Sequence, residues 1–312
     1  MIGLADVEAA TRRIDGRVRR TPVAPVGGAD LGLAGPAWLK LEHLQHTGSF
    51  KARGAFNRVL AAAETGGLGA GVVTASGGNA GLAVAYAAGT LGVPAEVYVP
   101  LTAPAHKVTK LKALGAEVRQ VGDEYAEANE AALARAAQTG ALFCHAYDQP
   151  EICAGQGTVA LEMLDQIDGL DTVILAVGGG GLLAGVAAAL AGRARVVGVE
   201  PETIPTLHAA LRAGHPVDVD VSGVAADSLG ARRVGEIAYR VAVDTEVRSV
   251  LVADGDIVEA RRLMWERFRL VVEHAAAAAV AAAVTGAYRP EPGERVGILL
   301  CGANTDPTDL AH

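Results

Sequence analysis

Short apolar runs alternate with helical segments from residue 72 onward, and this alternation constrains the fold more than any other feature of the chain. The turns between the runs are short, which is typical of parallel βαβ units in an open sheet covered by helices. Strands are predicted at residues 72–74, 95–99, 117–121, 141–144, 172–177, 196–199 and 295–300. Helices are predicted at residues 81–91, 105–114, 127–138, 156–167 and 182–190, and over the alanine-rich run 275–283. The pattern predicts an α/β protein with mainly parallel sheets.

The length and continuity of this pattern bear on the number of domains. A chain of 312 residues is long for a single hydrophobic core. No linker rich in proline, serine or charge divides the chain, and it shows no repeat of fixed period. We therefore expect two interleaved domains, a larger one made of residues 1–63 and 148–312 and a smaller, mobile one made of residues 64–147.

The composition argues against several classes of partner. Lysine and arginine total 27 against 35 aspartates and glutamates, which gives a net charge of −8 without any basic tract. This balance argues against nucleic acid or an anionic membrane as a partner. Cys144, Cys153 and Cys301 cannot all pair within one chain and lack the spacing of metal ligands. We therefore expect a reducing, cytoplasmic compartment and no metal site.

The segments 173–192 and 1–20 bear on whether the chain carries a membrane span or a targeting signal. The stretch 173–192 carries no charge and is long enough to raise the question of a transmembrane helix. The four glycines at 178–181 divide it into a short apolar strand and an alanine- and leucine-rich helix, which favours a buried core. Residues 1–20 mix acidic and basic side chains and lack the apolar run of a signal peptide. No membrane partner is therefore expected.

One lysine stands out among the candidate functional residues. Lys51 lies in the segment TGSFKARG at 47–54, among small and hydroxylated residues and directly after the aromatic Phe50. Burial lowers the pKa of a lysine and frees its lone pair to attack a carbonyl, as the lysine of a Schiff base does. A structural lysine is the alternative, although an ordinary surface lysine would lie in a more polar, helix-favouring stretch.

The four glycines at 178–181 follow one predicted strand and open the next predicted helix. Backbone N–H groups without side chains, at the positive end of a helix, form a cradle for phosphate. A tight strand-to-helix turn explains the glycines alone equally well. Glu200 ends the following strand and could bind a ribose, so a dinucleotide site is a weaker alternative.

Two further loops also follow predicted strands. One offers a hydroxyl, an amide and free N–H groups, and it comprises Ser76, Gly77, Gly78, Asn79 and Ala80. These groups suit a carboxylate and a phenolic oxygen, but a helix cap uses the same residue types. The other loop begins at Cys301, where a cysteine is most often a core residue. Glu273, which borders the alanine run, either caps that helix or faces a site.

Together and in this order, these segments resemble the fold-type-II pyridoxal-phosphate enzymes, in particular the serine/threonine dehydratases (threonine ammonia-lyases). The resemblance covers the chain from about residue 20 to residue 306. It is carried by KLE at 40–42, TGSFKARGA at 47–55, SGGNAG at 76–81, the four glycines, VEP at 199–201 and CGAN at 301–304. It implies two interleaved, tryptophan-synthase-β-like open sheets, with cofactor bound by the larger domain and substrate approached by the smaller. Pyridoxal 5′-phosphate is the implied cofactor.

The resemblance also implies a role for each cofactor residue. Lys51 would form the Schiff base and act as the catalytic base, and Phe50 would pack on the cofactor ring. Asn79 would bond the 3′-oxygen of the ring, with Glu273 also at the cofactor. The phosphate would be held by Gly178, Gly179, Gly180 and Gly181.

Cys301 has the position where this family places a serine or cysteine against the pyridine nitrogen. A neutral thiol does not keep that nitrogen protonated as an aspartate would, so the ring is a weaker electron sink and prompt β-elimination is favoured. By the same resemblance, the loop at 76–80 would bind the substrate carboxylate.

The chain departs from the family pattern at several positions. Gly77 stands where related serine racemases carry a serine as the acid and base of the second face, so racemisation by that route is disfavoured. Thr206 stands where the family's divalent-cation site, shared with Glu200, has an acid, so no metal is expected. His274 replaces a proline after Glu273, and Ser228 replaces a glycine, and both changes bear on the substrate pocket.

The implied reaction is the dehydration and deamination of a small β-hydroxy amino acid, such as L-threonine or L-serine, to a 2-oxo acid and ammonia. A racemase and a β-replacing enzyme of the same fold are the alternatives, and a non-catalytic ligand-binding α/β protein is a third. The replacing enzymes carry Lys-Asp-Arg where this chain has KAR at 51–53. A homodimer is typical of the family. Since the printed sequence stops soon after Asp306, we expect no isoleucine inhibition through a C-terminal regulatory domain.

Overall fold

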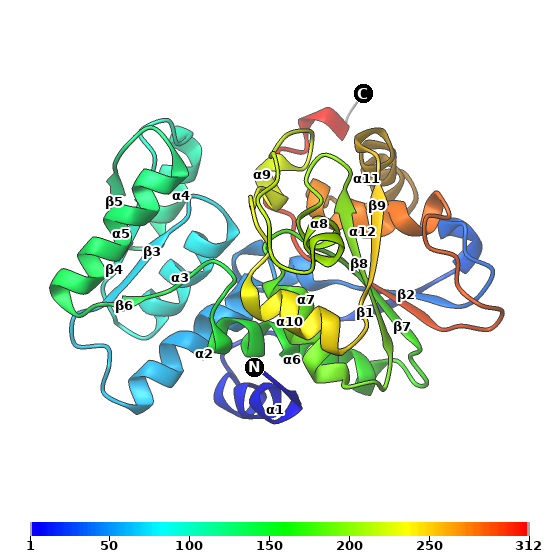
Figure 1. The fold of residues 1–312 in the computed structure, drawn as a ribbon, viewed down its shortest axis with the longest axis horizontal. Helices are drawn as coiled ribbons and strands as arrows, with labels where there is room; N and C mark the ends of the chain where they lie inside the picture. The colour runs from blue at the N-terminus through cyan, green and yellow to red at the C-terminus, as the bar shows by residue number, and fades with distance from the viewer. Residues whose placement is uncertain (1, 311–312) are drawn as a thin grey trace.

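Two separate β-sheets organise the structure, a computed structural model that describes residues 2–310 (Figure 1). The larger sheet has the strand order β1-β2-β10-β7-β8-β9 and the smaller β5-β4-β3-β6, and only the β1–β2 pair is antiparallel among the described residues. The larger sheet comprises β1 (Val23–Val26), β2 (Ala37–Lys40), β7 (Thr172–Ala176), β8 (Arg195–Pro201), β9 (Arg248–Val252) and β10 (Val296–Leu299). The smaller comprises β3 (Val72–Ala75), β4 (Ala95–Val99), β5 (Glu117–Gln120) and β6 (Leu142–Phe143).

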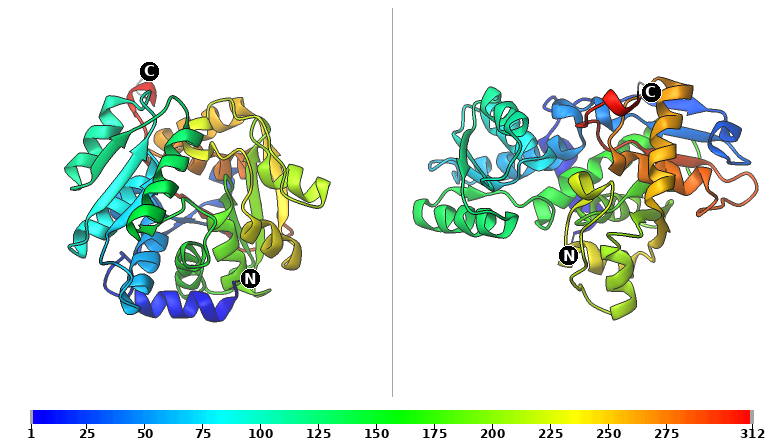
Figure 2. Two further views of the ribbon diagram at one scale, coloured as in Figure 1. Left: turned by 60° about the vertical axis from the view of Figure 1, so that its left-hand side comes forward. Right: turned by 90° about the horizontal axis from the view of Figure 1, so that it is seen from above.

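The two sheets are interleaved along the chain. The smaller sheet is made from the internal stretch 72–143, whereas the larger takes strands from both sides of it. The helices α3 (Asn79–Thr90), α4 (Ala105–Ala113) and α5 (Tyr125–Thr139) accompany the smaller sheet at one end of the molecule (Figure 1, Figure 2). This confirms the predicted pair of interleaved, mainly parallel α/β sheets. The residue boundaries given above for two domains stay predictions.

The remaining helices surround the larger sheet or join it to the smaller one. They are α1 (Leu4–Arg13), α2 (Lys51–Glu64), α6 (Pro150–Gln166), α7 (Gly181–Leu190), α8 (Thr206–Ala213), α9 (Ala226–Leu229), α10 (Glu236–Asp244), α11 (Asp254–Phe268) and α12 (His274–Val284). Helix α2 contacts both α3, beside the smaller sheet, and α6, beside the larger. Lys51, its first residue, therefore lies where the two parts of the molecule meet.

The strands predicted from residue 72 onward are all present, although the segment 141–144 pairs only over Leu142–Phe143. The predicted start of a helix at residue 156 is wrong, because α6 begins at Pro150, a favoured first residue of a helix. Gly155 and Gly157 resemble helix breakers in the sequence, yet both lie inside α6. The strands β1, β2 and β9 were not predicted.

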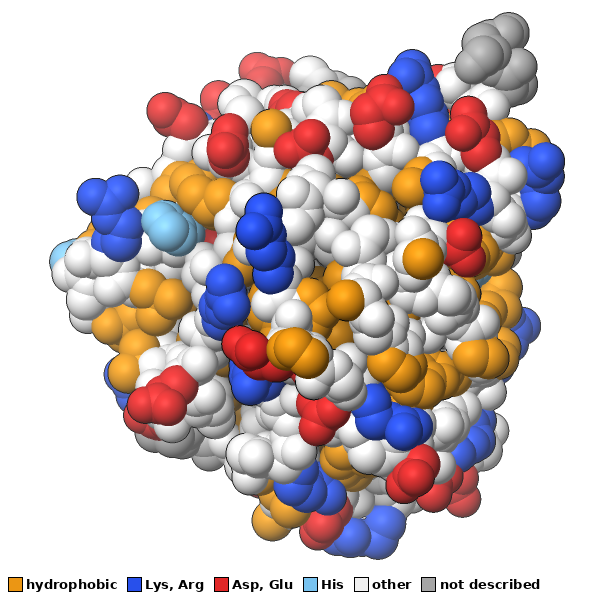
Figure 3. All heavy atoms as spheres, turned by 90° about the vertical axis from the view of Figure 1, so that its right-hand side faces the viewer, with side chains coloured by type: hydrophobic (Ala, Val, Ile, Leu, Met, Phe, Trp, Pro, Cys, Tyr) orange, Lys and Arg blue, Asp and Glu red, His pale blue; other side chains and the backbone are white. Residues whose placement is uncertain are grey.

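The uncharged stretch 173–192 forms β7, the glycine loop and α7 inside the core, as predicted. Leu183, Val186 and Leu190 of α7 are completely buried. Among residues 2–310, no helix is both long enough and apolar enough to cross a membrane. On the face drawn in Figure 3, acidic and basic side chains are interspersed with hydrophobic ones.

Helices α6 and α7 touch backbone to backbone, and glycines make this contact possible. A Cβ atom on Gly185 would lie 2.1 Å from the carbonyl oxygen of Cys153 and 2.4 Å from the amide nitrogen of Gly157. A Cβ on Gly157 would lie 2.4 Å from the carbonyl oxygen of Gly185. Real Cβ atoms do not approach backbone so closely, so any side chain here would force the helices apart. Helix α7, which begins at the last of the four glycines, is thereby fixed against α6.

This contact gives a first prediction. Gly185→Ala should lower the free energy of unfolding by at least about 2 kcal/mol, because the added methyl group cannot fit between two backbones. The matched control is Gly255→Ala in α11, where a Cβ meets nothing within 4 Å. It should leave stability unchanged or raise it by up to about 1 kcal/mol. Urea unfolding followed by circular dichroism checks both variants, and equal effects would contradict the packing argument.

Candidate active site

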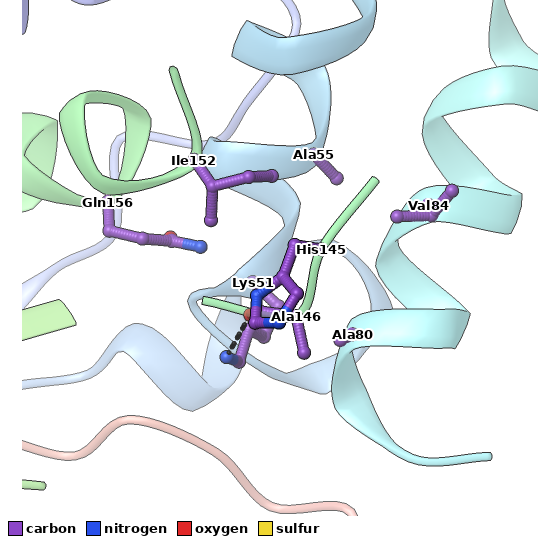
Figure 4. A pocket seen from close by; sticks show the side chains of 8 residues that line it. All are labelled: Lys51, Ala55, Ala80, Val84, His145, Ala146, Ile152 and Gln156. Carbon is purple, nitrogen blue, oxygen red and sulfur yellow. Dashed lines mark hydrogen bonds between the residues drawn. The ribbon is translucent and has the colours of Figure 1, made fainter. Parts of the chain in front are cut away.

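Lys51 is partly buried at the start of α2, with its amine against the segment that carries Ala146. Its Nζ donates a 2.8 Å hydrogen bond to the carbonyl oxygen of Ala146 and lies 5.0 Å from the centre of the Phe50 ring (Figure 4). Burial lowers the pKa of Lys51 to about 8, against the opposing influence of Cys153, Cys301 and Glu273. An amine with this pKa is partly neutral near physiological pH, so it can act as a nucleophile or a base.

The start of α2 is anchored by a buried group of two cations and two carboxylates. Arg53 is fully buried and donates to Glu42 at 2.6 Å and to Glu162 at 2.7 Å. Lys40, also fully buried, donates to the other oxygen of Glu162 at 2.7 Å. These ion pairs connect the residues after β2, the first turn of α2, and α6. Because Arg53 lies two residues after Lys51, in the first turn of α2, we infer that this network positions Lys51.

The residues just before Lys51 are hydrogen-bonded to the backbone that follows β10. The N–H of Phe50 donates to the carbonyl oxygen of Cys301 at 3.0 Å, and Ser49 forms an isolated β-bridge with Gly302. The Cys301 side chain is buried, and burial raises its pKa well above the usual range, which keeps the thiol neutral. Its Sγ lies 4.0 Å from Oε1 of Glu273.

Asn79 is held from two sides by partners far away in the sequence. Its Nδ2 donates to Oε1 and Oε2 of Glu273 at 3.1 and 3.0 Å. Its Oδ1 accepts from Nδ2 of Asn304 at 2.7 Å, and the same nitrogen donates to the carbonyl oxygen of Thr47 at 2.7 Å. Sequence reasoning assigned no role to Asn304, although its position after a predicted strand, in CGAN, was a usable signal. Asn304 thus connects the Asn79 loop to the segment that carries Lys51.

Glu273 is 3% exposed and occupies the N-cap position of the alanine-rich helix α12, but its carboxylate makes no capping hydrogen bond and faces this site instead. Burial raises its pKa to about 7, while the hydrogen bond from Asn79 acts in the opposite direction. Ser228, one of the departures noted in the sequence, accepts a 3.1 Å hydrogen bond from the N–H of Ala275. It therefore helps to cap the same helix, whose first residue is His274.

The four-glycine loop presents unpaired N–H groups. Among the residues that the structure describes, none of the amides from 178 to 183 has a hydrogen-bond acceptor. The carbonyls, by contrast, are occupied: that of Gly178 by the Thr206 hydroxyl at 2.6 Å, that of Gly179 by the amide of Gly235 at 3.0 Å, and that of Gly180 by the amide of Ala184 at 2.9 Å. Gly180 has φ +86°, a conformation that favours glycine. A run of free amides at the start of α7 is an anion-binding arrangement.

Side chains also enforce glycine within this loop. A Cβ atom on Gly179 would lie 2.3 Å from the ring of Tyr147, next in sequence to the Ala146 carbonyl that accepts from Lys51. A Cβ on Gly181 would lie 2.6 Å from the carbonyl oxygen of Tyr147. The segment of Ala146 and Tyr147 therefore contacts both Lys51 and the glycine loop.

Glu200 is not available as a ligand at the site. It is completely buried and caps α8, accepting from the amides of Leu207 at 2.7 Å and His208 at 2.9 Å. The Thr206 hydroxyl lies 3.0 Å from its Oε1. The interpretation of Glu200 as a ribose-binding acid is therefore wrong, because the helix cap occupies both of its oxygens.

The loop at 76–80 begins α3 and forms a second anion-binding end. The Ser76 hydroxyl accepts from the amide of Gly78 at 3.2 Å, and Asn79 and Ala80 are the first residues of the helix. Their amides have no acceptor among residues 2–310. Two helix N-termini with unpaired amides and a lysine of lowered pKa are thus parts of one site, an arrangement suited to a lysine-dependent enzyme whose ligands carry anionic groups.

Comparison with known proteins identifies the family. The family model described as pyridoxal-phosphate dependent enzyme matches residues 14–302, and the chain belongs to this family. The L-threonine ammonia-lyase of Thermotoga maritima is 36% identical over 309 residues, which cover 98% of this chain and 76% of that protein. The phenylserine dehydratase of Ralstonia pickettii is 37% identical, over 99% of this chain and 95% of that protein. The structure of maize serine racemase matches with a TM-score of 0.93 at 31% identity, over 99% of this chain and 96% of that one.

The residues present fit pyridoxal phosphate, the cofactor of this family. The free amides at 178–183 suit its phosphate, and the amine of Lys51, with its lowered pKa, suits its aldehyde. Asn79 and the neutral thiol of Cys301 offer polar groups for a ring between these ends. The fold is accordingly fold type II, as predicted.

The raised pKa of Glu273 gives a second prediction. Its folded-state pKa of about 7 lies above the ordinary carboxyl value of 4.5, so the folded protein binds more protons than the unfolded chain between these values. Stability attributable to Glu273 is therefore present at low pH and lost as pH rises toward 7. In cofactor-free protein, Glu273→Gln should match the wild type at about pH 4, below the unfolded pKa, and exceed it by up to about 3 kcal/mol at about pH 7.5. Urea unfolding at both pH values checks this, and a pH-independent difference would contradict it.

Proposed function

We propose that this protein is a lyase that catalyses β-elimination from a small β-hydroxy amino acid, such as L-threonine or L-serine, giving a 2-oxo acid and ammonia. The observation that carries the proposal is the placement of Lys51, with its lowered pKa. Its amine contacts Ala146, and the next residue, Tyr147, packs against the glycine loop. Relatives named as L-threonine ammonia-lyase and phenylserine dehydratase support the reaction class.

Different residues of the chain bind the substrate, remove the proton and hold the cofactor in this reaction. The N-terminus of α3, with the loop at 76–80, binds the substrate carboxylate and so orients the α-carbon. The amine of Lys51 removes the α-proton as general base. The free amides at 178–183 bind the cofactor phosphate, and Phe50, Asn79 and Cys301 surround the ring. When bound, pyridoxal phosphate supplies an electron-withdrawing ring that stabilises negative charge at the α-carbon.

Gly77 favours elimination over racemisation. Racemisation requires a proton donor on the face of the substrate opposite Lys51, and glycine offers none there. A Cβ atom on Gly77 would meet only Val99 Cγ1 at 3.5 Å, which is ordinary contact, so the space for a side chain exists and this chain leaves it unused. Following the chirality of L-serine against ammonia release separates the two reactions, and inversion at the rate of elimination would overturn this argument.

Three further expectations complete the proposal. The unpaired thiols of Cys144, Cys153 and Cys301 support a reducing, cytoplasmic location. A homodimer is proposed because homodimers are typical of the family, and sedimentation equilibrium tests this. Residues 64–147 are proposed to move as a unit over the substrate, because α4 reaches the other part of the molecule through an ion pair between Lys107 and Asp227 of α9.

The third prediction tests Lys51 directly. Lys51→Ala should abolish the visible absorbance of the bound cofactor and its bleaching by borohydride, and should lower ammonia release from L-serine and L-threonine by at least about 10³-fold. The control Lys112→Ala changes an exposed lysine of α4 and should behave as wild type. A wild-type protein that takes up no pyridoxal phosphate would refute the proposed function. A screen of L-threonine, L- and D-serine, 3-phenylserine and 3-hydroxyaspartate identifies the substrate.

The fourth prediction tests closure through the Lys107–Asp227 ion pair. Asp227→Asn should raise KM for the substrate by about 2- to 5-fold with little change in kcat, the size expected of an exposed ion pair. The difference should shrink in high salt, which screens such pairs. Glu259→Gln, which removes an ion pair with Arg262 inside α11, is the matched control. Steady-state kinetics at two salt concentrations checks both, and an unchanged KM for Asp227→Asn would contradict closure through this pair.

A further inference from the structure

A small cavity lies beside Lys51, on the side of α3 and α6. It has a volume of about 10 Å³ and is bordered by Lys51, Ala80, His145, Ala146 and Gln156, with apolar side chains completing the wall (Figure 4). This volume corresponds to about one water molecule, which needs two to four polar partners to be stable in a protein interior. Ala80 belongs to the loop proposed to bind the substrate carboxylate, so the cavity lies between that loop and the proposed catalytic base.

His145 is fixed in one tautomer by its own loop. Its Nδ1 lies 3.1 Å from the amide nitrogen of Tyr147 and 2.8 Å from that of Asp148, and both amides donate to it. A ring nitrogen that accepts two hydrogen bonds carries no proton, so the proton of the neutral ring is on Nε2. Burial lowers the pKa of His145, against Asp148, which raises it, so the ring is neutral. The cavity wall therefore includes a histidine whose free group is an N–H donor.

Gln156 is oriented in the same way. Its side chain is 1% exposed, and its Oε1 accepts from the amide of Gly54 at 3.3 Å, which assigns oxygen and nitrogen in the amide. Its Nε2 has no acceptor among the described residues, and Figure 4 shows the amide directed toward the side of the cavity where Lys51 and His145 lie. A buried amide donor without a partner is costly unless something else accepts from it.

We propose that this cavity receives the β-hydroxyl of the substrate as it leaves, held by the Nε2–H of His145 and the Nε2–H of Gln156. The proposal rests on the proposed β-elimination and assigns the leaving group a place in it. Two neutral N–H donors match an oxygen that becomes negative as its bond to carbon breaks, and they stabilise that charge most in a buried site. Neither donor is itself an acid at neutral pH, and the proposal assigns the proton of the departing water to the ammonium of Lys51, which has just taken it from the α-carbon.

The balance of the step is simple. The Cα–H bond breaks, the proton goes to the amine of Lys51, and the electron pair becomes the second bond between Cα and Cβ. The Cβ–O bond breaks with its electron pair on oxygen. The ammonium of Lys51 then gives its proton to that oxygen, so that water forms in the cavity and the amine is restored. No oxidant or reductant is needed.

The test compares two leaving groups in the holoenzyme. L-Serine loses a hydroxyl, which needs donors and a proton, whereas β-chloro-L-alanine loses chloride, which needs neither. His145→Asn keeps an oxygen acceptor at the position of Nδ1 and removes the donor at Nε2. His145→Gln does the reverse, placing an amide N–H near Nε2. Gln156→Met retains the volume and removes the amide, and His215→Leu, at an exposed histidine, is the control.

We expect His145→Asn and Gln156→Met to lower kcat with L-serine by about 10²-fold, the size of one lost oxyanion donor, and to leave kcat with β-chloro-L-alanine within about threefold. His145→Gln should retain most of the activity with L-serine. The visible absorbance of the cofactor and the unfolding temperature should not change. Equal losses with both substrates, or a His145→Gln variant as poor as His145→Asn, would overturn the assignment while leaving the proposed function intact. A wild type inactive on both substrates would instead refute the proposed function itself.

Discussion

The buried ion network of Arg53, Lys40, Glu42 and Glu162 is the interaction on which the rest of the site depends. Two charges of each sign are removed from water together, which is tolerable only when every one is closely paired. Losing one partner would leave an uncompensated buried charge, so the network accepts only one arrangement of α2 against α6. That arrangement places Lys51 at the meeting point of the two parts of the molecule.

From this anchor, the contacts form a continuous chain around the site. Backbone bonds tie Phe50 to Cys301, and the amide of Glu273 donates to the carbonyl of Gly302 at 3.1 Å. Glu273 then holds Asn79 at the start of α3. In the other direction, Lys51 reaches the segment of Ala146, whose neighbour packs on the glycine loop. Both helix N-termini are therefore positioned by contacts that pass through residues beside the lysine.

Most of the parallel strands, with the exception of β2 and β9, could be predicted from the sequence, because apolar runs and the glycine turns that follow them are local signals. Sequence reasoning missed β1 and β2, whose hairpin contains Pro25 and has no crossover helix to mark it. Gly155 and Gly157 hid the first turns of α6, because Gly155 permits close contact with α2 and Gly157 with α7, and only the structure shows these partners. The pairing of Asn79 with Glu273 joins residues far apart in the chain, and periodicity carries no information about it.

Desolvation gives the site its electrostatic character. Burial moves the pKa of Lys51 down to about 8 and that of Glu273 up to about 7, and it keeps Cys301 as a thiol. Near neutral pH the interior therefore carries little fixed negative charge, while free amides face it from the starts of α3 and α7. Such a site attracts a ligand with anions at both ends and repels none of its charge. Because both helix starts offer backbone amides and not ionised carboxylates, burial outweighs the opposing influence of Glu273, and the pKa of Lys51 stays low.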